Sequence, residues 1–279
     1  MSDDLARHQL SRRGLAPLQG AGMPPYLVEH FQRMDSPYHP RDRPDGYIPM
    51  CIAENGLMWD LLEPKARAPR KVPASAFGYD HMIGSLELRE QLADFAARNF
   101  LGRRFGPEQI VALAGAGSVL EMLFYVIADQ GDAVLVPTPS YAGFWMDLET
   151  RDQLRIVPVH TEARDGFRLT TAALDAAVAG SERPVRALLF TSPDNPLGTV
   201  YSADQIAEIA AWAESHGLHL VLDEVYALSV FGNQPFTSVA SVRPSLGELI
   251  HIVWAFSKDM AASGLRCGVL FSENRGVLD

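Results

Sequence analysis

From about residue 85 onward, helical segments alternate with short apolar runs that end at polar or small residues. Strands that alternate with helices in this way are typical of a mostly parallel sheet with helices on both faces. We therefore predict a three-layer α/β fold around a seven-stranded sheet. The candidate strands are residues 110–114, 133–137, 154–159, 185–191, 218–223, 250–255 and 267–271.

One helix between these strands has clear signals at both ends. Ser202 and Gln205 have the spacing of a capping box, in which each side chain pairs with the backbone amide of the other residue. Gly217 is a typical helix stop. The pattern predicts a helix between these signals whose apolar face consists of Ile206, Ile209, Ala210 and Ala213.

Residues 1–75 differ in character, because they are rich in Pro, Arg and Asp, and prolines interrupt any long element. We predict an irregular N-terminal arm with short helices over 1–75 and a large domain over 76–279. The last segment, 273–279, follows a predicted core strand without the helix that should cover it. We therefore expect a large domain truncated at its C-terminal end, with the C-terminal small domain absent, so that the chain is either a fragment or lacks its closing domain.

The composition limits the class of protein and its partners. A chain of 279 residues with 47% hydrophobic content can bury one large core. The 24 Lys and Arg against 34 Asp and Glu give a net charge of −10, which argues against nucleic acid or an anionic membrane as the main partner. Cys51 and Cys267 are too few for a disulfide framework and lack the paired spacing of metal ligands, so we expect no metal.

The small number of cysteines and the sequence of the N-terminus predict a reducing, cytoplasmic location. The N-terminus, Met1-Ser2-Asp3-Asp4-Leu5, has neither the basic start nor the apolar run of a signal peptide. No apolar stretch of about 18 residues, the length needed to cross a membrane, follows it.

Lys258 follows one of the predicted strands, and Arg266 stands eight positions after it. An amine that can form an imine, followed by an arginine that can bind a phosphate, suggests pyridoxal phosphate. A lone lysine after a strand is more often a solvated surface charge. The cofactor hypothesis therefore depends on four further groups: an acid for the ring nitrogen, donors to the ring oxygen, a phosphate site and a surface on which the ring stacks.

Polar residues that meet the first two needs stand at the ends of neighbouring strands. Asp223 closes an apolar strand and can hold the ring nitrogen protonated; otherwise it caps the next turn. Tyr226 can donate its hydroxyl to the ring oxygen, although a tyrosine here can equally serve packing. Asn195, between two prolines, can donate its amide to the same oxygen or simply form a Pro-Asn turn, and an Asn before Pro can favour an unusual peptide geometry.

A phosphate cup, defined as residues 115–118 together with Arg266, follows the first predicted strand. Ala116, Gly117 and Ser118 open a helix that we expect to begin near Ser118, and its amides and dipole favour an anion. Arg266 adds a bidentate charge, and Ser257 can add a hydroxyl. A dinucleotide fingerprint would need glycine at position 120, which is Leu120, so that alternative fails.

Two tyrosines complete the candidate site. Tyr141 follows a strand and can stack on the cofactor ring, with core packing as the alternative. Tyr79 precedes the first regular helix and can reach a phosphate.

The order and spacing of these residues resemble those of the fold-type I aminotransferases of class I/II, from about residue 47 to the end. The resemblance implies that Lys258 holds the cofactor, Asp223 pairs with the ring nitrogen, Tyr226 and Asn195 donate to the ring oxygen, Arg266 and Ser257 bind the phosphate, and Tyr141 stacks on the ring. It also assigns Tyr79 to the phosphate in the partner subunit, which implies a homodimer.

Within this family, residues 52–62 resemble the A-E-N-x-L-x-x-D-L-L stretch of 1-aminocyclopropane-1-carboxylate synthases and their microbial relatives. The resemblance places Glu54 near the substrate; its alternative role is a cap or a surface acid. Those relatives include transaminases and carbon–sulfur lyases with much the same motifs. The family also uses a second arginine, from a C-terminal domain, to bind the substrate carboxylate. This chain stops before that domain, and we expect it to bind substrate poorly as written.

The function that we predict is that of a class I/II aminotransferase acting on an amino acid. The substrate displaces Lys258 from the cofactor, and the freed amine removes the α-proton. Reprotonation at the cofactor followed by hydrolysis gives transamination, whereas expulsion of a γ-sulfonium group gives the cyclopropane product. The alternatives are a synthase-like or carbon–sulfur lyase activity and a non-catalytic or truncated subunit that binds the cofactor. A DNA-binding regulator is disfavoured because the arm contains no basic recognition helix.

Overall fold

The computed structural model describes residues 9–19 and 24–279. The chain divides into two compact units, Met1–Asn55 and Gly56–Asp279. The described part of the first unit contains two helices, α2 (Arg12–Gln19) and α3 (Pro25–Arg33). They are followed by a turn region in which Pro37 bridges to Tyr47 and His39 to Arg43. Pro25 occupies the first position of α3, where its missing N–H costs no helical hydrogen bond.

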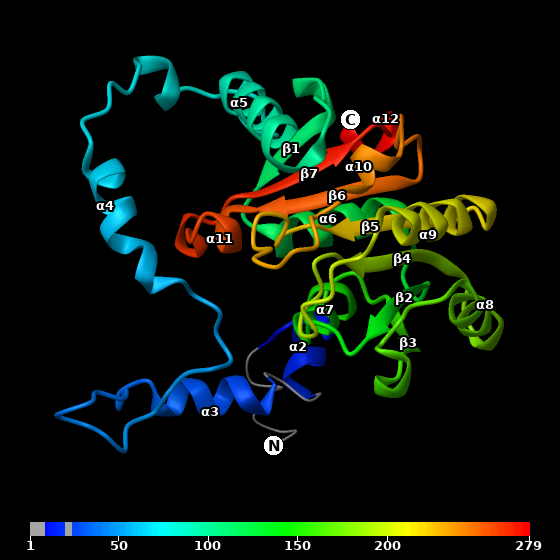
Figure 1. Cartoon of the computed structure of the whole chain (residues 1–279), viewed down its shortest axis with the longest axis horizontal. Helices are drawn as coiled ribbons and strands as arrows, with labels where there is room; N and C mark the ends of the chain where they lie inside the picture. Colours follow the sequence, from blue (N-terminus) through cyan, green and yellow to red (C-terminus); the bar gives the residue numbers. More distant parts are fainter. Residues whose placement is uncertain (1–8, 20–23) are drawn as a thin grey trace. The chain divides into compact units, whose positions relative to one another are not determined.

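The second unit is built on a seven-stranded sheet (Figure 1). The strands are β1 (Ile110–Leu113), β2 (Ala133–Thr138), β3 (Arg155–His160), β4 (Val185–Thr191), β5 (His219–Asp223), β6 (Ile250–Ala255) and β7 (Gly268–Ser272). Their order is β1-β7-β6-β5-β4-β2-β3. β7 runs antiparallel to both of its neighbours, and every other pairing is parallel. The prediction of a mostly parallel, seven-stranded sheet is confirmed, and each strand lies within one residue of its predicted bounds.

Alternate residues of the strands face two separate apolar layers. Leu188, Leu220 and Ile252 belong to the core on one face, and Leu189, Val221 and Val253 belong to the core on the other. The first layer is covered by α5 (Leu86–Ala96), α8 (Thr171–Gly180), α9 (Ala203–Ser215) and α10 (Val239–Val242). The second layer is covered by α6 (Ala116–Ile127) and α7 (Gly143–Glu149). Burial on both faces explains why the central strands are mostly apolar.

Helix α9 confirms its predicted signals. The hydroxyl of Ser202 accepts the N–H of Gln205, and the side chain of Gln205 accepts the N–H of Ser202 at 3.1 Å. Gly217 follows the helix with a φ of +64°, which a residue with a Cβ adopts only at a cost. All four residues of the predicted apolar face are buried: Ile206, Ile209, Ala210 and Ala213.

The expectation that no helix follows the last strand was wrong. A one-turn helix, α12 (Arg275–Leu278), follows β7, and the side chain of Asn274 caps it by accepting the N–H of Val277 at 3.2 Å. Val277 and Leu278 pack against the same apolar layer as α6 and α7. A helix of four residues is too short to produce a periodic apolar pattern, so the sequence pattern did not predict it.

The remaining elements of the second unit are short. Helix α5 continues directly into a π-helical turn, η3 (Ala97–Leu101). The others are η1 (Gly56–Met58), α4 (Trp59–Arg67), η2 (Ala74–Phe77), η4 (Pro107–Gln109), η5 (Ala163–Asp165), α11 (Phe256–Asp259) and η6 (Ser263–Leu265). Among the described residues, no helix is both long enough and apolar enough to span a bilayer.

Candidate active site

Three neighbouring parallel strands deliver the predicted site residues at the same edge of the sheet. β4 ends at Thr191, four residues before Asn195, and β5 ends at Asp223, three residues before Tyr226. β6 leads directly into α11, which carries Ser257 and Lys258 and lies at the end of that strand in Figure 1. The carboxyl ends of parallel strands are where α/β proteins bind ligands.

Asp223 is a buried carboxyl close to the lysine. Its side chain is 6% exposed, and one oxygen accepts the N–H of Val225 at 3.1 Å. Burial, partly offset by the Val225 bond, raises the pKa of Asp223 to about 7; the charge of Asp147 also raises it, and the charge of Lys258 lowers it. A protonated ring nitrogen placed at this carboxyl would supply the counter-charge that burial removes.

Asn195 and Tyr226 form a pair of donors. The side-chain amide of Asn195 donates to the hydroxyl of Tyr226 at 3.4 Å. Burial, followed by the charges of Asp223 and Tyr141, raises the pKa of Tyr226 to about 12, so its hydroxyl keeps its proton. The peptide bond between Asn195 and Pro196 is cis, in line with the unusual geometry considered for an Asn before Pro.

The phosphate cup forms where β1 meets α6. Helix α6 begins at Ala116, two residues earlier than predicted, and Gly115 provides no side-chain cap for its first amides. Arg266 donates to the carbonyls of Ser263 at 3.0 Å and Ala114 at 3.5 Å, and a Cβ on Gly115 would lie only 2.8 Å from its Cζ. A guanidinium therefore lies beside uncapped helix amides, which is an arrangement that binds phosphate.

The close approach of two chain segments explains the glycines of this cup. Leu113 at the end of β1 pairs with Gly268 at the start of β7. A Cβ on Gly268 would lie 2.6 Å from the amide nitrogen of Ala116, closer than real Cβ atoms come to backbone. The residue after Cys267 must therefore be glycine for Arg266 to reach the cup. Ser118 directs its hydroxyl to the carbonyl of Ala114 at 3.3 Å.

Tyr141 lies near the donor pair. Its ring packs edge-on against Phe144, with 5.3 Å between the ring centroids, and the side chain remains 44% exposed. Its charge acts on the pKa of Tyr226, so the two phenols are close. An aromatic surface is thus available beside Tyr226, and stacking of Tyr141 on a cofactor ring stays a prediction.

The structure describes no contact that joins three of the predicted residues, Ser257, Tyr79 and Glu54, to the other residues of the candidate site. Ser257 is half-buried on α11, and Tyr79 is 99% exposed after η2. Glu54 is exposed and belongs to the other compact unit, Met1–Asn55. Their roles toward phosphate, the partner subunit and substrate stay predictions.

Sequence reasoning missed two acids. Asp147 on α7 places a carboxyl oxygen 3.4 Å from where a Cβ on Gly117 would be, and burial, then the charge of Glu121, raises its pKa to about 6. Since Asp147 also acts on Asp223, it lies between the phosphate cup and the ring-nitrogen site. Asp147, the acid that interrupts the apolar run Phe144–Leu148 of α7, was the available signal. The second acid is Asp259, directly after Lys258, which hydrogen-bonds two other segments.

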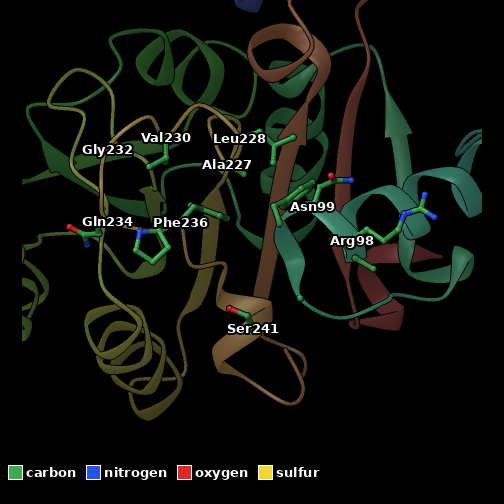
Figure 2. A pocket seen from close by; sticks show the side chains of 13 residues that line it. Arg98, Asn99, Ala227, Leu228, Val230, Gly232, Gln234, Phe236 and Ser241 are labelled. Carbon is green, nitrogen blue, oxygen red and sulfur yellow. The ribbon is translucent and has the colours of Figure 1, made fainter.

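Two cavities flank the loop that follows Tyr226, residues 227–236. One, of about 410 Å³, is lined by Asn195, Tyr226 and part of this loop. The other, of about 530 Å³, lies between the loop and the π-helical turn, where Figure 2 shows Leu228 and Val230 on one side and Arg98 and Asn99 on the other.

The residues present fit pyridoxal phosphate. The chain has three lysines, and Lys65 and Lys71 are exposed and precede the sheet, so Lys258 is the amine at the strand ends. It lies with a buried acid, a pair of ring-oxygen donors and an anion cup. Within the described residues, no group of three His, Cys, Asp or Glu side chains could hold a metal ion.

This fold and site define a protein of the pyridoxal phosphate-dependent, fold-type I class. The family model for aminotransferase class I and II matches residues 60–279. The chain belongs to this family, as the resemblance implied.

The chain is similar in sequence to 1-aminocyclopropane-1-carboxylate synthases. The chain is 37% identical over 262 residues to 1-aminocyclopropane-1-carboxylate synthase 6 of Arabidopsis thaliana, covering 88% of this chain and 53% of the synthase. It is 34% identical over 275 residues to synthase 2 of Solanum lycopersicum, covering 91% of this chain and 56% of that one. The chain thus spans about half the length of these relatives.

Solved structures agree with the fold. The aromatic aminotransferase of Pyrococcus horikoshii matches with a TM-score of 0.64 and 30% identity, over 72% of this chain and 52% of that one. The aspartate aminotransferase of Rhizobium meliloti matches with a TM-score of 0.73 over 96% of this chain and 64% of that one; at 23% identity it supports the fold alone.

Proposed function

We propose that this chain is the pyridoxal phosphate-binding part, residues 76–279 with the arm 1–75, of an enzyme that acts on an amino acid, in the first place an aminotransferase. The observation that carries the proposal is Asp223, a buried carboxyl with a raised pKa that lies within the electrostatic reach of Lys258. A structural protein gains nothing from such a carboxyl, whereas a cationic heterocycle beside it would be stabilised.

Each residue then has a defined task. The phosphate cup binds the phosphate, and Tyr141 covers one face of the ring. Asp223 keeps a proton on the ring nitrogen, while Asn195 and Tyr226 donate to the ring oxygen. When bound, pyridoxal phosphate supplies a conjugated ring that accepts the electron pair left by removal of the α-proton. Lys258 first tethers the cofactor, and its Nζ then takes that proton from the substrate and can return it.

A second candidate function is a synthase-like or carbon–sulfur lyase activity. The observation that favours it is the level of identity to 1-aminocyclopropane-1-carboxylate synthases, 37% and 34%, together with the motif around Glu54. Both functions share the removal of the α-proton by Lys258 and differ in the next step, which is reprotonation followed by hydrolysis in one case and loss of a sulfur leaving group in the other. Incubation with S-adenosylmethionine, and separately with an amino donor and a 2-oxo acid, distinguishes them by product.

We further propose that the active unit is a homodimer. Large apolar side chains are exposed in the segment that contains Tyr79: Leu57 is 96% exposed, Phe77 87% and Met82 80%. Several large exposed apolar side chains within one segment favour a protein interface, and Tyr79 would then reach the phosphate of the partner subunit. A cytoplasmic location stays our expectation, because the two cysteines, Cys51 and Cys267, are both free thiols.

The test of the proposed function is uptake of pyridoxal phosphate by the purified chain. We expect a visible absorbance band that survives desalting and is lost in Lys258→Ala. Lys65→Ala and Lys71→Ala are matched controls, because they remove the other two amines of the lysine side chains and should keep the band. A wild-type protein that stays colourless would contradict the proposal.

A further inference from the structure

We infer that Asp259 is a positioning residue that couples the lysine-bearing turn to the loop behind Tyr226. The inference rests on the proposed function, because it concerns the geometry of the same site. Asp259 directly follows Lys258 in α11, so a hydrogen bond to its carboxylate fixes the backbone from which Lys258 extends.

The carboxylate of Asp259 accepts three hydrogen bonds from two other segments. One oxygen accepts the hydroxyl of Ser229 at 2.7 Å. The other accepts the backbone N–H of Leu228 at 3.0 Å and the indole N–H of Trp254 at 2.9 Å. Both oxygens are therefore engaged, as suits a carboxylate, which acts only as an acceptor.

The three donors come from positions that matter for the site. Leu228 and Ser229 stand two and three residues after Tyr226, and the N–H of Ser229 donates to the carbonyl of Tyr226 at 2.9 Å. Trp254 is fully buried in β6 and packs against Phe100, with 5.3 Å between their ring centroids. Asp259 thus links the turn of Lys258 to the backbone of Tyr226 and to a rigid aromatic core.

Loop 227–236 needs such a link because a cavity lies on each side of it. Leu228 and Val230 line the cavity of about 530 Å³ (Figure 2), while Ser229 and Val230 line the cavity of about 410 Å³. Loop 227–236 thus borders a cavity on each flank, and hydrogen bonds to Asp259 hold Leu228 and Ser229 between the two cavities. A site keeps its geometry only when the groups that support it are themselves held.

The decisive variant is Asp259→Asn, which keeps the size of the side chain and replaces an acceptor oxygen with a donor. Its matched control is Asp175→Asn, since Asp175 accepts the indole N–H of Trp212 at 2.7 Å between α8 and α9. Both variants lose a carboxylate–indole bond, but only the first loses one beside Lys258.

Three readouts are compared: the dissociation constant of pyridoxal phosphate, the pH midpoint of its visible band, and amide exchange of loop 227–236 in the cofactor-free protein. For Asp259→Asn we expect roughly tenfold weaker cofactor binding, the order found when groups that orient a ligand are removed. We also expect a shifted midpoint and faster exchange at Leu228. Asp175→Asn should match the wild type in all three.

The outcomes separate this inference from the proposed function. A wild type without a visible band contradicts the proposed function, and exchange at Leu228 then still decides whether Asp259 holds the loop. Equal cofactor affinity, midpoint and exchange in Asp259→Asn and Asp175→Asn overturn the inference. If Asp259→Asn does not fold, Ser229→Ala decides: loss of one hydrogen bond should weaken cofactor binding about threefold, and no change in binding or exchange overturns the inference.

Discussion

The side-chain amide of Asn195 donates to the phenolic oxygen of Tyr226 across 3.4 Å, although 31 positions separate the two residues. Because this bond uses Tyr226 as an acceptor, the hydroxyl proton of Tyr226 remains for another oxygen. A ring oxygen placed beside the pair would then receive donors from two strands, β4 and β5.

We expect Tyr226→Phe to raise the pH midpoint of the visible band by about one unit, since one pH unit corresponds to about the worth of one hydrogen bond. The lost donor would otherwise stabilise negative charge on the ring oxygen and so favour loss of the nearby proton. A spectrophotometric pH titration measures the midpoint. Tyr125→Phe, at an exposed position of α6, is the control and should leave it unchanged.

Asp223→Asn should make the cofactor-free protein more stable at pH 7.5 relative to the wild type. Burial raises the folded-state pKa of Asp223 from 3.8 to about 7, so its contribution to stability is complete below pH 3.8 and is lost as the pH rises through 7. When the pH rises from 4.5 to 7.5, the free energy of unfolding of the variant minus that of the wild type should increase by about 3 kcal/mol.

Urea unfolding at both pH values measures this difference. Glu182→Gln, which changes an exposed acid, should follow the wild type at both pH values. A constant difference between Asp223→Asn and wild type across this range would contradict the raised pKa.

Gly115→Ala should damage the phosphate cup beyond its effect on the backbone. The new methyl group would press on the guanidinium of Arg266, and the φ of +94° adds strain. Gly131→Ala is a matched control, because Gly131 has a φ of +89° but nothing within 4 Å of a Cβ. Both variants should lose about 1–3 kcal/mol of stability.

Cofactor binding separates the two glycine variants. Titration with pyridoxal phosphate should show at least about a tenfold loss of affinity for Gly115→Ala, the effect of losing charged hydrogen bonds to a phosphate, and none for Gly131→Ala. Equal affinities would mean that Arg266 does not bind the phosphate.

His251 should act on acid stability in the opposite direction to Asp223. It is fully buried between the ring of His219 at 3.0 Å and the hydroxyl of Ser272 at 2.9 Å. Burial, then the charge of His219, lowers its pKa from 6.5 to about 3. Its contribution is therefore complete above pH 6.5 and is lost as the pH falls toward 3.

When the pH falls from 7.5 to 5, the free energy of unfolding of the wild type should decrease by about 2 kcal/mol because of this histidine. His251→Asn should not show this decrease. Urea unfolding at the two pH values gives the difference. His160→Asn, at an exposed position that bonds Thr138, is the control and should lose stability in parallel with the wild type.

Strands and site residues differed in how far the sequence could predict them. The runs that became β4 and β6 are mostly apolar, because helices cover both faces, and their bounds were predicted without error. Asp223 and Lys258 were predicted as site residues because Asp223 closes one such run and Lys258 stands three residues after the end of another. Local sequence suffices where a residue's place depends on the strand that carries it.

Asp147 and Asp259 are site residues that the local sequence could not predict. Asp147 matters because α7 folds back beside Gly117, and Asp259 matters because loop 227–236 returns to α11. Neither approach leaves a periodic pattern. The helix α12 was missed for a related reason, since one turn with an Asn cap has no apolar repeat to detect.

The position of β7 determines when the phosphate cup can form during folding. Within the part of the chain that the structure describes, β7 is the last strand in sequence, yet it lies between β1 and β6, and β1 pairs with β7 alone. Arg266 and Ala114, 152 positions apart, meet only through that pairing. Contacts of such long range form slowly, because a large loop must close first. In a growing polypeptide the phosphate cup therefore forms only after β7 has been synthesised and has paired with β1.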